Sequence, residues 1–322
     1  MDTLNRIRAD LLGKLEVRKT WVQKSDFIEW VLAYASGMGV KAVVEEGGKH
    51  VRSRNVVFGD AEKAKVLITA HYDTCARLPF PNFMTPCSWP GILLTQGALL
   101  LGWMLLGGGA GFLLGRLMRP LAMPVWLATA VSMVAVLLVC AGLLALMLVG
   151  PANPHTANDN TSGVATVLMA MEALRGRDDI AYVLFDNEEK GLLGSAAFAQ
   201  RHPAAAKRAF IVQYDCVSDG GTLLYTGSRA GMECAEGRRM AAALERVAGE
   251  HGRRVATGAF PKVIYPSDQM LFARGTAFAA LRGERLLYLD RIHTARDTVF
   301  DEENLLMMVE VLEAFVWDKT GN

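Results

Sequence analysis

Acidic and imidazole side chains follow the short apolar segments of this sequence, at the points where strands would end. The groups that come directly after such segments are His71, Asp73, Glu188, Glu189 and Asp215. In open α/β sheets, binding and catalytic sites form beyond the carboxyl ends of the strands, so we expect these side chains to converge. Asp159 and His293 belong with them. Asp159 stands just before a predicted helix, whose free N–H groups favour a carboxylate, and His293 follows another apolar run.

This set of residues has the chemistry of a metal-dependent hydrolase. Zinc takes oxygen and nitrogen donors and, in catalytic sites, keeps one position open for water. Two metals that share a carboxylate would lower the pKa of that water and polarise a scissile carbonyl. Hydrolysis also needs a spare carboxylate as general base, and the adjacent Glu188 and Glu189 can supply one base and one ligand.

The sequence around these residues alternates between predicted strands and predicted helices. The strands, all short and apolar, are Arg54–Phe58, Lys65–Ala70, Ile180–Asp186, Phe210–Tyr214, Thr222–Tyr225 and Thr276–Leu281. The helices are Ser25–Gly37, Thr161–Leu174, Leu192–Gln200, Met232–Glu250 and Glu302–Trp317. Such alternation predicts an α/β fold in which helices flank a mostly parallel mixed sheet.

Two long apolar runs interrupt this alternation, over Gly91–Gly115 and Leu121–Gly150. Each run is long enough to cross a hydrocarbon core of about 30 Å as a helix. The connection between them, residues 116–120, is too short to do more than reverse the chain, so the runs predict an antiparallel two-helix hairpin. Glycines at 107–109 and 111 would let the two helices approach closely.

We interpret the hairpin as a transmembrane insert that contacts membrane lipid through residues 91–149. A buried core hairpin and a dimerisation arm are the alternatives. The insert, over residues 85–152, divides one catalytic domain into residues 1–84 and 153–322. His71 and Asp159 lie on opposite sides of the insert, and only an even number of spans returns both to one site.

Composition excludes one class of partner and favours a reducing compartment. Lys plus Arg number 34 and Asp plus Glu 33, so no basic surplus points to nucleic acid. Five cysteines without paired spacing, Cys75 and Cys216 among them, indicate free thiols. Residues 1–24 are typical of an amphipathic helix and not of a signal peptide. We therefore expect the catalytic domain to face the cytoplasm, although Arg116 and Arg119 in the hairpin connection favour the opposite orientation.

Six segments of the sequence resemble, in order, those of the co-catalytic di-zinc aminopeptidases. They are ITAHYDT, ANDNTSGVA, FDNEEKGLLGS, VQYDCV, YPSDQMLF and RIHTARDT. This metallopeptidase family includes bacterial leucyl aminopeptidases, glutamate carboxypeptidase and glutaminyl cyclases. The resemblance spans Lys65 to Thr298 and leaves out the first few tens of residues and the hairpin.

Carried over by position, the resemblance implies that the chain binds two zinc ions. His71 and Asp215 would hold one ion, Glu189 and His293 would hold the other, and Asp159 would bridge them. These roles are what the resemblance implies for the matching positions of this sequence.

The resemblance also implies roles for neighbouring groups. Glu188 would be the general base, and Asp73 would accept a hydrogen bond from His71 and fix its tautomer. The peptide bond Asp159–Asn160 would be cis. Gln269 stands where many similar proteins have His, which leaves the substrate pocket open. Beside His293, Arg296 and Asp297 would form either a supporting ion pair or a surface turn.

The implied activity is that of a zinc-dependent exopeptidase, which removes N-terminal residues from peptides by a bridging water that two zincs and Glu188 activate. One alternative is a glutaminyl cyclase-like aminoacyltransferase, which would use a single zinc ion and leave His71 unused. The other is a catalytically inactive membrane adaptor.

Overall fold

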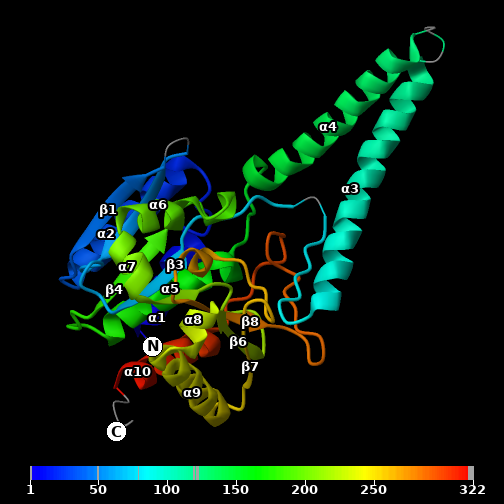
Figure 1. Cartoon of the computed structure of the whole chain (residues 1–322). Helices are drawn as coiled ribbons and strands as arrows, with labels where there is room; N and C mark the ends of the chain where they lie inside the picture. Colours follow the sequence, from blue (N-terminus) through cyan, green and yellow to red (C-terminus); the bar gives the residue numbers. More distant parts are fainter. Residues whose placement is uncertain (1, 49–50, 79, 119, 121–122, 318–322) are drawn as a thin grey trace.

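An eight-stranded mixed sheet lies at the centre of the computed structural model, which describes residues 2–48, 51–78, 80–118, 120 and 123–317 (Figure 1). The strands are β1 (Ala42–Gly47), β2 (Ser53–Phe58), β3 (Val66–His71), β4 (Ile180–Phe185), β5 (Phe210–Tyr214), β6 (Thr222–Gly227), β7 (Arg254–Ala259) and β8 (Gly275–Leu281). Their order in the sheet is β1-β2-β4-β3-β5-β8-β6-β7. The pairs β3–β4, β3–β5, β5–β8 and β6–β7 are parallel, and the remaining pairs are antiparallel.

Helices cover both faces of this sheet, as the alternating pattern predicts. They are α1 (Asp2–Gly13), α2 (Trp21–Gly37), α5 (Gly163–Ala173), α6 (Leu193–Arg201), α7 (Pro203–Arg208), α8 (Arg229–Glu233), α9 (Ala235–Glu250) and α10 (Glu302–Trp317). Successive strand residues point to opposite faces: Ile68 joins a core with α1, α2, α5, α9 and α10, whereas Leu67 joins a core with α6 and α7. The predicted fold class is confirmed.

The edge strands β1 and β7 were not predicted from the sequence. Both consist of exposed and partly exposed residues and carry charge, as in Glu45, Glu46 and Arg254, so neither forms the continuous apolar run that marked the other strands.

The predicted helix Met232–Glu250 is divided into two helices in the structure. Cys234 is extended, and its thiol accepts the N–H of Gly237 at 3.3 Å, which starts α9 afresh.

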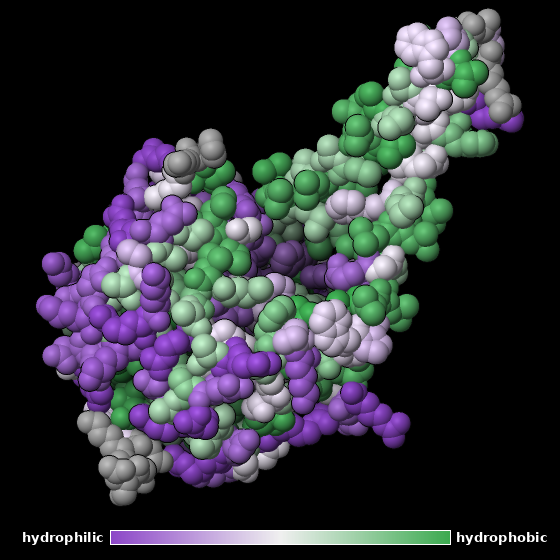
Figure 2. All heavy atoms as spheres, viewed as in Figure 1, coloured by the Kyte–Doolittle hydropathy of each residue, from purple (hydrophilic) through white to green (hydrophobic). Residues whose placement is uncertain are grey.

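The apolar runs form two helices, α3 (Trp89–Met118) and α4 (Val125–Val149), that project together from the domain (Figure 1). Their surface is largely hydrophobic, unlike that of the domain (Figure 2). Only Gly107, Gly111 and Met118 are buried among the described residues of these helices, so the alternative of a buried core hairpin is wrong. Both helices are long and apolar enough to cross a membrane, by length and composition.

The two arms touch through part of the predicted glycine cluster. A Cβ on Gly107 or Gly111 would lie 3.2 Å from the side chain of Val136 in α4, whereas one on Gly108 or Gly109 would meet nothing within 4 Å. Small residues four positions apart therefore form the contact face. In the connection between the arms, Arg119 lies outside the described residues.

The two ends of the hairpin meet at a neck beside the sheet. Ala76 and Ala152 form an antiparallel bridge, the N–H of Arg77 donates to the carbonyl of Pro151 at 2.8 Å, and that of Asn153 donates to Cys75 at 3.2 Å. The chain thus leaves the α/β domain and re-enters it at one point, as expected for an inserted hairpin.

Candidate metal centre

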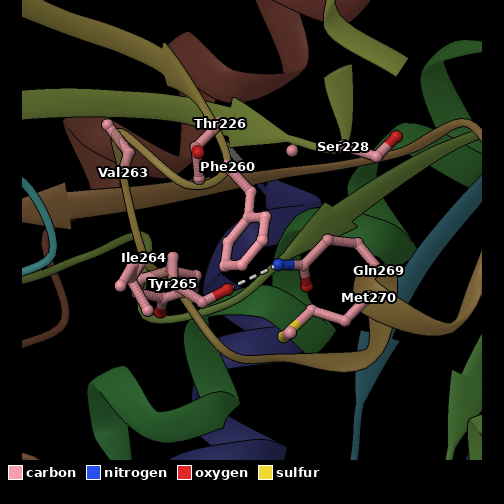
Figure 3. A pocket seen from close by; sticks show the side chains of 9 residues that line it. Thr226, Ser228, Phe260, Val263, Ile264, Tyr265, Gln269 and Met270 are labelled. Carbon is pink, nitrogen blue, oxygen red and sulfur yellow. Dashed lines mark hydrogen bonds between the residues drawn. The ribbon is translucent and has the colours of Figure 1, made fainter. Parts of the chain in front are cut away.

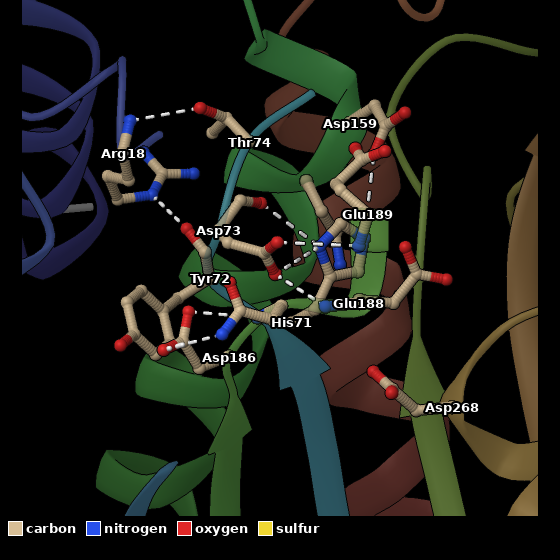
Figure 4. A network of polar contacts seen from close by, with 12 residues as sticks. Arg18, His71, Tyr72, Asp73, Thr74, Asp159, Asp186, Glu188, Glu189 and Asp268 are labelled. Atoms are coloured by element: carbon tan, nitrogen blue, oxygen red, sulfur yellow. Dashed lines mark hydrogen bonds and ion pairs between the residues drawn. The ribbon is translucent and has the colours of Figure 1, made fainter. Parts of the chain in front are cut away.

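The side chains at the strand ends converge at one edge of the sheet (Figure 4). His71 ends β3, and Asp215 follows β5, which pairs with β3 in parallel. Glu188 and Glu189 lie in the short 3-10 turn after β4, the parallel neighbour on the other side of β3. Asp159 joins them from the irregular segment Ala157–Ser162 before α5. Carboxyl ends of parallel strands meet at the same edge, which explains the convergence.

Each carboxylate oxygen of Asp159 faces a different histidine. Its Oδ1 lies 3.4 Å from Nε2 of His71, and its Oδ2 lies 3.1 Å from Nε2 of His293. The same nitrogen of His71 lies 3.6 Å from Oδ1 of Asp215, and that of His293 lies 3.4 Å from Oε2 of Glu189. Asp159 therefore belongs to two groups of donors at once.

The spacing of these donors matches a zinc ion. Zinc bonds to nitrogen and oxygen measure about 2.0–2.2 Å, so the edge of a zinc tetrahedron is about 3.3–3.6 Å. The four donor separations around Asp159 run from 3.1 to 3.6 Å. Oε1 of Glu189 is also buried without a hydrogen-bond partner among the described residues. The donor set therefore fits two ions that share one carboxylate.

A thiol stands beside the second group of donors. Cys75 is buried, and its sulfur lies within 4.8 Å of donor atoms of Asp159, Glu189 and His293. Cys75 and Cys216 are both free and buried, as the sequence indicated.

Asp73 holds the turn that carries the two glutamates. Its Oδ1 accepts the main-chain N–H of Glu188 at 3.0 Å, and its Oδ2 accepts that of Glu189 at 3.3 Å. Nδ1 of His71 lies 3.1 Å from the main-chain oxygen of Asp73 and 3.6 Å from its carboxylate, so the main-chain oxygen is the nearer acceptor. The carboxylate is committed to the turn, so the carbonyl orients the imidazole.

The segment that carries Asp159 is fixed by its main chain. The bond Asp159–Asn160 is cis, as the resemblance implied. Asp297 accepts the N–H of Asn158 at 2.8 Å and that of Asp159 at 3.0 Å. Its own N–H closes a turn to the carbonyl of Thr294 at 3.1 Å, so the predicted turn is present, but the carboxylate of Asp297 is buried and holds the Asp159 segment. Arg296 instead lies 3.6 Å from the carboxylate of Asp290.

Arg18 ties the His71 loop to the Asp159 segment, and Figure 4 shows its contacts with Tyr72 and Thr74. Its guanidinium is fully buried and donates to the carbonyl of Tyr72 and, at 3.0 Å, to the hydroxyl of Thr161. Its main-chain N–H donates to the hydroxyl of Thr74 at 2.9 Å. Burial lowers the pKa of Arg18 to about 10, which leaves the group charged at neutral pH.

The crowding of carboxylates shifts several pKa values. Burial raises the pKa of Glu188 well above its ordinary value, and the nearby Glu189 and Asp268 add to this against the opposing effect of His71. Burial also raises the pKa of Glu189 to about 8, while His293 opposes the shift. Burial acts to lower the pKa of His293, but Glu189 and Asp159 raise it to about 9.

A family model of peptidase family M28 matches residues 139–316, more than half of the chain. This chain belongs to peptidase family M28. The matched part contains Asp159, Glu188, Glu189, Asp215 and His293 and begins inside α4. No curated protein matches the sequence.

Solved structures of M28-like proteins share the fold at low sequence identity. The LapA aminopeptidase of Legionella pneumophila is 13% identical, with a TM-score of 0.56 over 98% of this chain and 68% of that one. A glutaminyl cyclase of Porphyromonas gingivalis is 16% identical, with a TM-score of 0.60 over 98% and 97%. A leucine aminopeptidase precursor of Bacteroides thetaiotaomicron is 13% identical, with a TM-score of 0.58 over 98% and 96%. These likenesses show that the fold is shared, and the family match indicates a peptidase.

One more carboxylate of this M28 site lies within a matching segment but was not singled out from the sequence. Asp268, in the YPSDQMLF segment, is fully buried and accepts the hydroxyl of Ser195 at 2.5 Å and the amide of Gln213 at 3.2 Å. Burial raises its pKa to about 7, although His71 opposes the shift. It lies beside Glu188 in Figure 4, so it extends the acidic cluster away from the metal donors.

Figure 3 shows an apolar pocket. Its volume is about 240 Å³, and its lining includes Phe260, Val263, Tyr265, Gln269 and Met270. Tyr265 connects it to the cluster, because its hydroxyl donates to the main-chain oxygen of Asp215 at 3.0 Å. The amide of Gln269 donates to the carbonyl of Tyr265 at 2.7 Å, so this residue supports the pocket wall.

Proposed function

We propose that this chain is a di-zinc aminopeptidase that its hydrophobic hairpin anchors in a membrane. The observation that carries the metal part is the position of Asp159, whose two oxygens lie 3.4 Å from His71 and 3.1 Å from His293, close to the edge lengths of two zinc tetrahedra. Asp215 completes the donor group with His71, and Glu189 completes the donor group with His293.

The roles of the residues follow from this arrangement. His71, Asp159 and Asp215 would hold one zinc ion, and Asp159, Glu189 and His293 would hold the other. When bound, the two ions supply Lewis-acid polarisation of the scissile carbonyl and lower the pKa of the attacking water. Asp73 and Asp297 act on the donors through the main chain, since each accepts two N–H groups of the loops that carry them.

Glu188 is proposed as the general base. It does not belong to the two groups centred on Asp159, but one of its carboxylate oxygens lies within 4.8 Å of donor atoms of His71 and Glu189. A carboxylate with a raised pKa is suited to accept a proton from water and to pass it to the leaving amine. The hydrogen bond from its main-chain N–H to Asp73 fixes the turn from which its side chain projects.

The substrate is proposed to be a peptide with a free N-terminus. The acidic cluster of Glu188, Glu189 and Asp268 favours a basic amine over a carboxylate. The apolar pocket behind Tyr265 would take the side chain of the first residue, and its lining by Phe260, Val263 and Met270 favours an apolar one.

The proposed anchor rests on the length and exposure of the hairpin. Helices of 30 and 25 residues extend about 45 and 37 Å, more than the hydrocarbon core of about 30 Å. Side chains such as Leu94, 73% exposed, and Leu138, 67% exposed, have no cover within the chain. A dimerisation arm would instead give a soluble dimer. Protease accessibility in sealed vesicles tests the proposal that the catalytic domain faces the cytoplasm.

One experiment tests the enzymatic proposal. The full chain, purified in detergent, is expected to contain close to two zincs and to hydrolyse aminoacyl reporter substrates. Glu188→Gln should retain the zinc and lose at least about 100-fold in kcat. Glu29→Gln, an exposed change on α2, serves as the matched control and should keep full activity. Full activity of Glu188→Gln would refute the role of the base, and an inert wild type with bound zinc would support an adaptor.

A glutaminyl cyclase-like activity is the second candidate. It is favoured by the fold of the Porphyromonas gingivalis glutaminyl cyclase, which aligns over nearly the full length of both chains. Metal content separates the two candidates, because near one zinc per chain, with cyclisation of an N-terminal glutaminyl peptide and no hydrolysis, would favour the cyclase. The complete donor group of His71, Asp159 and Asp215 is the reason to place the peptidase first.

A further inference from the structure

The neck of the hairpin lies next to the metal donors. Asn153 is hydrogen-bonded to Cys75, whose thiol is within 4.8 Å of three donor atoms, and α4 ends at Val149. Four residues span at most about 14 Å, so the donors lie no more than about 25 Å from the end of α4. The headgroup layer of a bilayer is about 5–7 Å thick on each side. A hairpin in a membrane would therefore hold the metal centre close to the bilayer surface.

The other arm begins beside the apolar pocket. The indole N–H of Trp89, the first residue of α3, donates to the carbonyl of Pro261 at 3.0 Å, and the preceding residue Phe260 lines the pocket. Phe260 itself is 54% exposed. Both the metal donors and the proposed side-chain pocket thus adjoin the base of the hairpin, where the two arms are splayed apart (Figure 1).

A crevice of about 400 Å³ opens between the splayed arms. Its apolar lining comes from the segment before α3 and from both arms, with Phe80, Phe83, Leu99, Trp103, Leu106 and Leu143. The indole N–H of Trp103 is buried and has no hydrogen-bond partner in the part of the chain that the structure describes. The crevice continues the exposed apolar surface of the arms, which Figure 2 shows in green.

The segment that lines this crevice also contacts the loop of His293. The N–H of Leu78 donates to the carbonyl of His293 at 2.9 Å, and the amide of Asn82 donates to that of Ile292 at 3.3 Å. Phe83 stacks on Tyr288 with ring centroids 4.8 Å apart. The segment that contains Leu78, Asn82 and Phe83 therefore lies between the apolar crevice and the proposed metal donor His293.

We infer that the substrates are peptides held in the membrane by an apolar segment that follows a short N-terminal stretch, and that the crevice between the arms seats this segment. The inference rests on the proposed function and names its substrate class. The unpartnered indole N–H of Trp103 offers a donor to a polar group of the seated segment. The short stretch before that segment then reaches the metal centre without leaving the surface of the bilayer.

The test uses the full chain in phospholipid vesicles together with peptides of identical N-terminal sequence. One series carries an apolar membrane-spanning segment after linkers of increasing length, and a matched peptide without that segment stays in solution. Linkers of about eight extended residues cover 25 Å, so these peptides should be cleaved at least about 10-fold faster than the soluble peptide. A metal centre on the far side of a domain roughly 45 Å across would instead need linkers about twice as long. Cleavage only with long linkers, or no preference for anchored peptides, overturns the inference.

A pair of glycine variants tests the crevice. A Cβ on Gly102, which lines the crevice, or on Gly109, which does not, would meet nothing within 4 Å, so both positions accept a larger side chain. Gly102→Leu should fill the crevice and slow the cleavage of anchored peptides at least about 5-fold, with soluble peptides unaffected, whereas Gly109→Leu should leave both rates unchanged. If the two variants cleave anchored peptides at equal rates, the crevice holds lipid only, and the proposal that it binds the apolar segment of the substrate is refuted. If neither soluble nor anchored peptides are cleaved by wild type, it is the proposed peptidase function that fails.

Discussion

The carboxylate of Asp297 holds the main chain of Asp159 and not its side chain. Oδ2 of Asp297 accepts the N–H of Asp159 at 3.0 Å, and Oδ1 accepts that of Asn158 at 2.8 Å. The carboxylate of Asp159 is thereby left free to face both histidines. We expect Asp297→Asn to reduce kcat/KM and zinc affinity about 10–100-fold, because an amide can accept through only one of its two atoms. Zinc titration and reporter kinetics measure both effects.

Asp290→Asn is the matched control for this prediction. Asp290 lies on the same loop, but it pairs with Arg282 and Arg296 and touches none of the donors. It should bind zinc as tightly as wild type. Equal losses in the two variants would mean that the loop as a whole, and not the contact with Asp159, is what matters.

His71→Ala should lower the zinc content from about two ions to about one per chain. The variant removes a donor from the group with Asp215 and leaves Asp159, Glu189 and His293 in place. His155→Ala changes a histidine whose side chain is 46% exposed, and it should leave the content unchanged. Elemental analysis after removal of loose metal measures the ratio. An unchanged content in His71→Ala contradicts the two-ion assignment.

Zinc affinity should fall as the pH falls below about 9. Burial acts to lower the pKa of His293, but Glu189 and Asp159 raise it to about 9, so below that pH the metal-free imidazole carries a proton. Zinc must displace this proton, which weakens binding by up to about 10-fold per pH unit for each proton displaced. Competition with a chelator at a series of pH values measures the slope. A flat profile between about pH 9 and pH 6 would speak against this protonation.

Asp268 should make the metal-free protein less stable as the pH rises. Burial raises the pKa of Asp268 to about 7 from 3.8, so the folded state holds a proton that the unfolded chain releases. Stability is therefore full below about pH 4 and falls through pH 7, by at most about 1.4 kcal/mol per unit. In Asp268→Asn this loss should disappear, so urea unfolding with a chelator present should show a gain over wild type at pH 8 and none at low pH. Asp178→Asn, an exposed change, should show no gain at either pH.

Phe260→Ala should raise KM for reporters with a leucyl side chain about 3–10-fold with little change in kcat. Phe260 lines the apolar pocket but touches none of the metal donors, so its loss weakens binding of the ground state and the transition state alike. Leu286→Ala, a similarly exposed change outside the pocket, serves as control. A fall in kcat at constant KM would assign Phe260 to another role.

The central fold could be predicted because buried parallel strands leave a plain signal. The strands β3, β4, β5 and β8 are mostly apolar and buried throughout, so each stands out as a short continuous run. The edge strands β1 and β7 are exposed and carry polar residues, so they lack that signal. Helix boundaries such as the break at Cys234 depend on a local cap that periodicity does not detect.

The residues of the site that follow strands could be predicted, whereas those that contact the site from distant parts of the sequence could not. Glu188, Glu189 and Asp215 follow strands, and the order of the strands brings them together. Asp297 accepts the main-chain N–H groups of Asn158 and Asp159, which lie 139 and 138 positions earlier in the sequence. Arg18 donates to Thr161, which lies 143 positions later. Nothing in the neighbouring sequence indicates these partners, because the fold alone places them.

The neck of the hairpin also bears on how the protein would adapt to different membranes. Both ends of the insert are fixed where Ala76 pairs with Ala152, so the sheet carries the same connection whatever the length of the arms. Whole helical turns can be added at the tip or lost from it while the donor atoms stay in place. Relatives in thicker or thinner bilayers would then differ in the arms and keep the neck, with the catalytic chemistry untouched by hydrophobic mismatch.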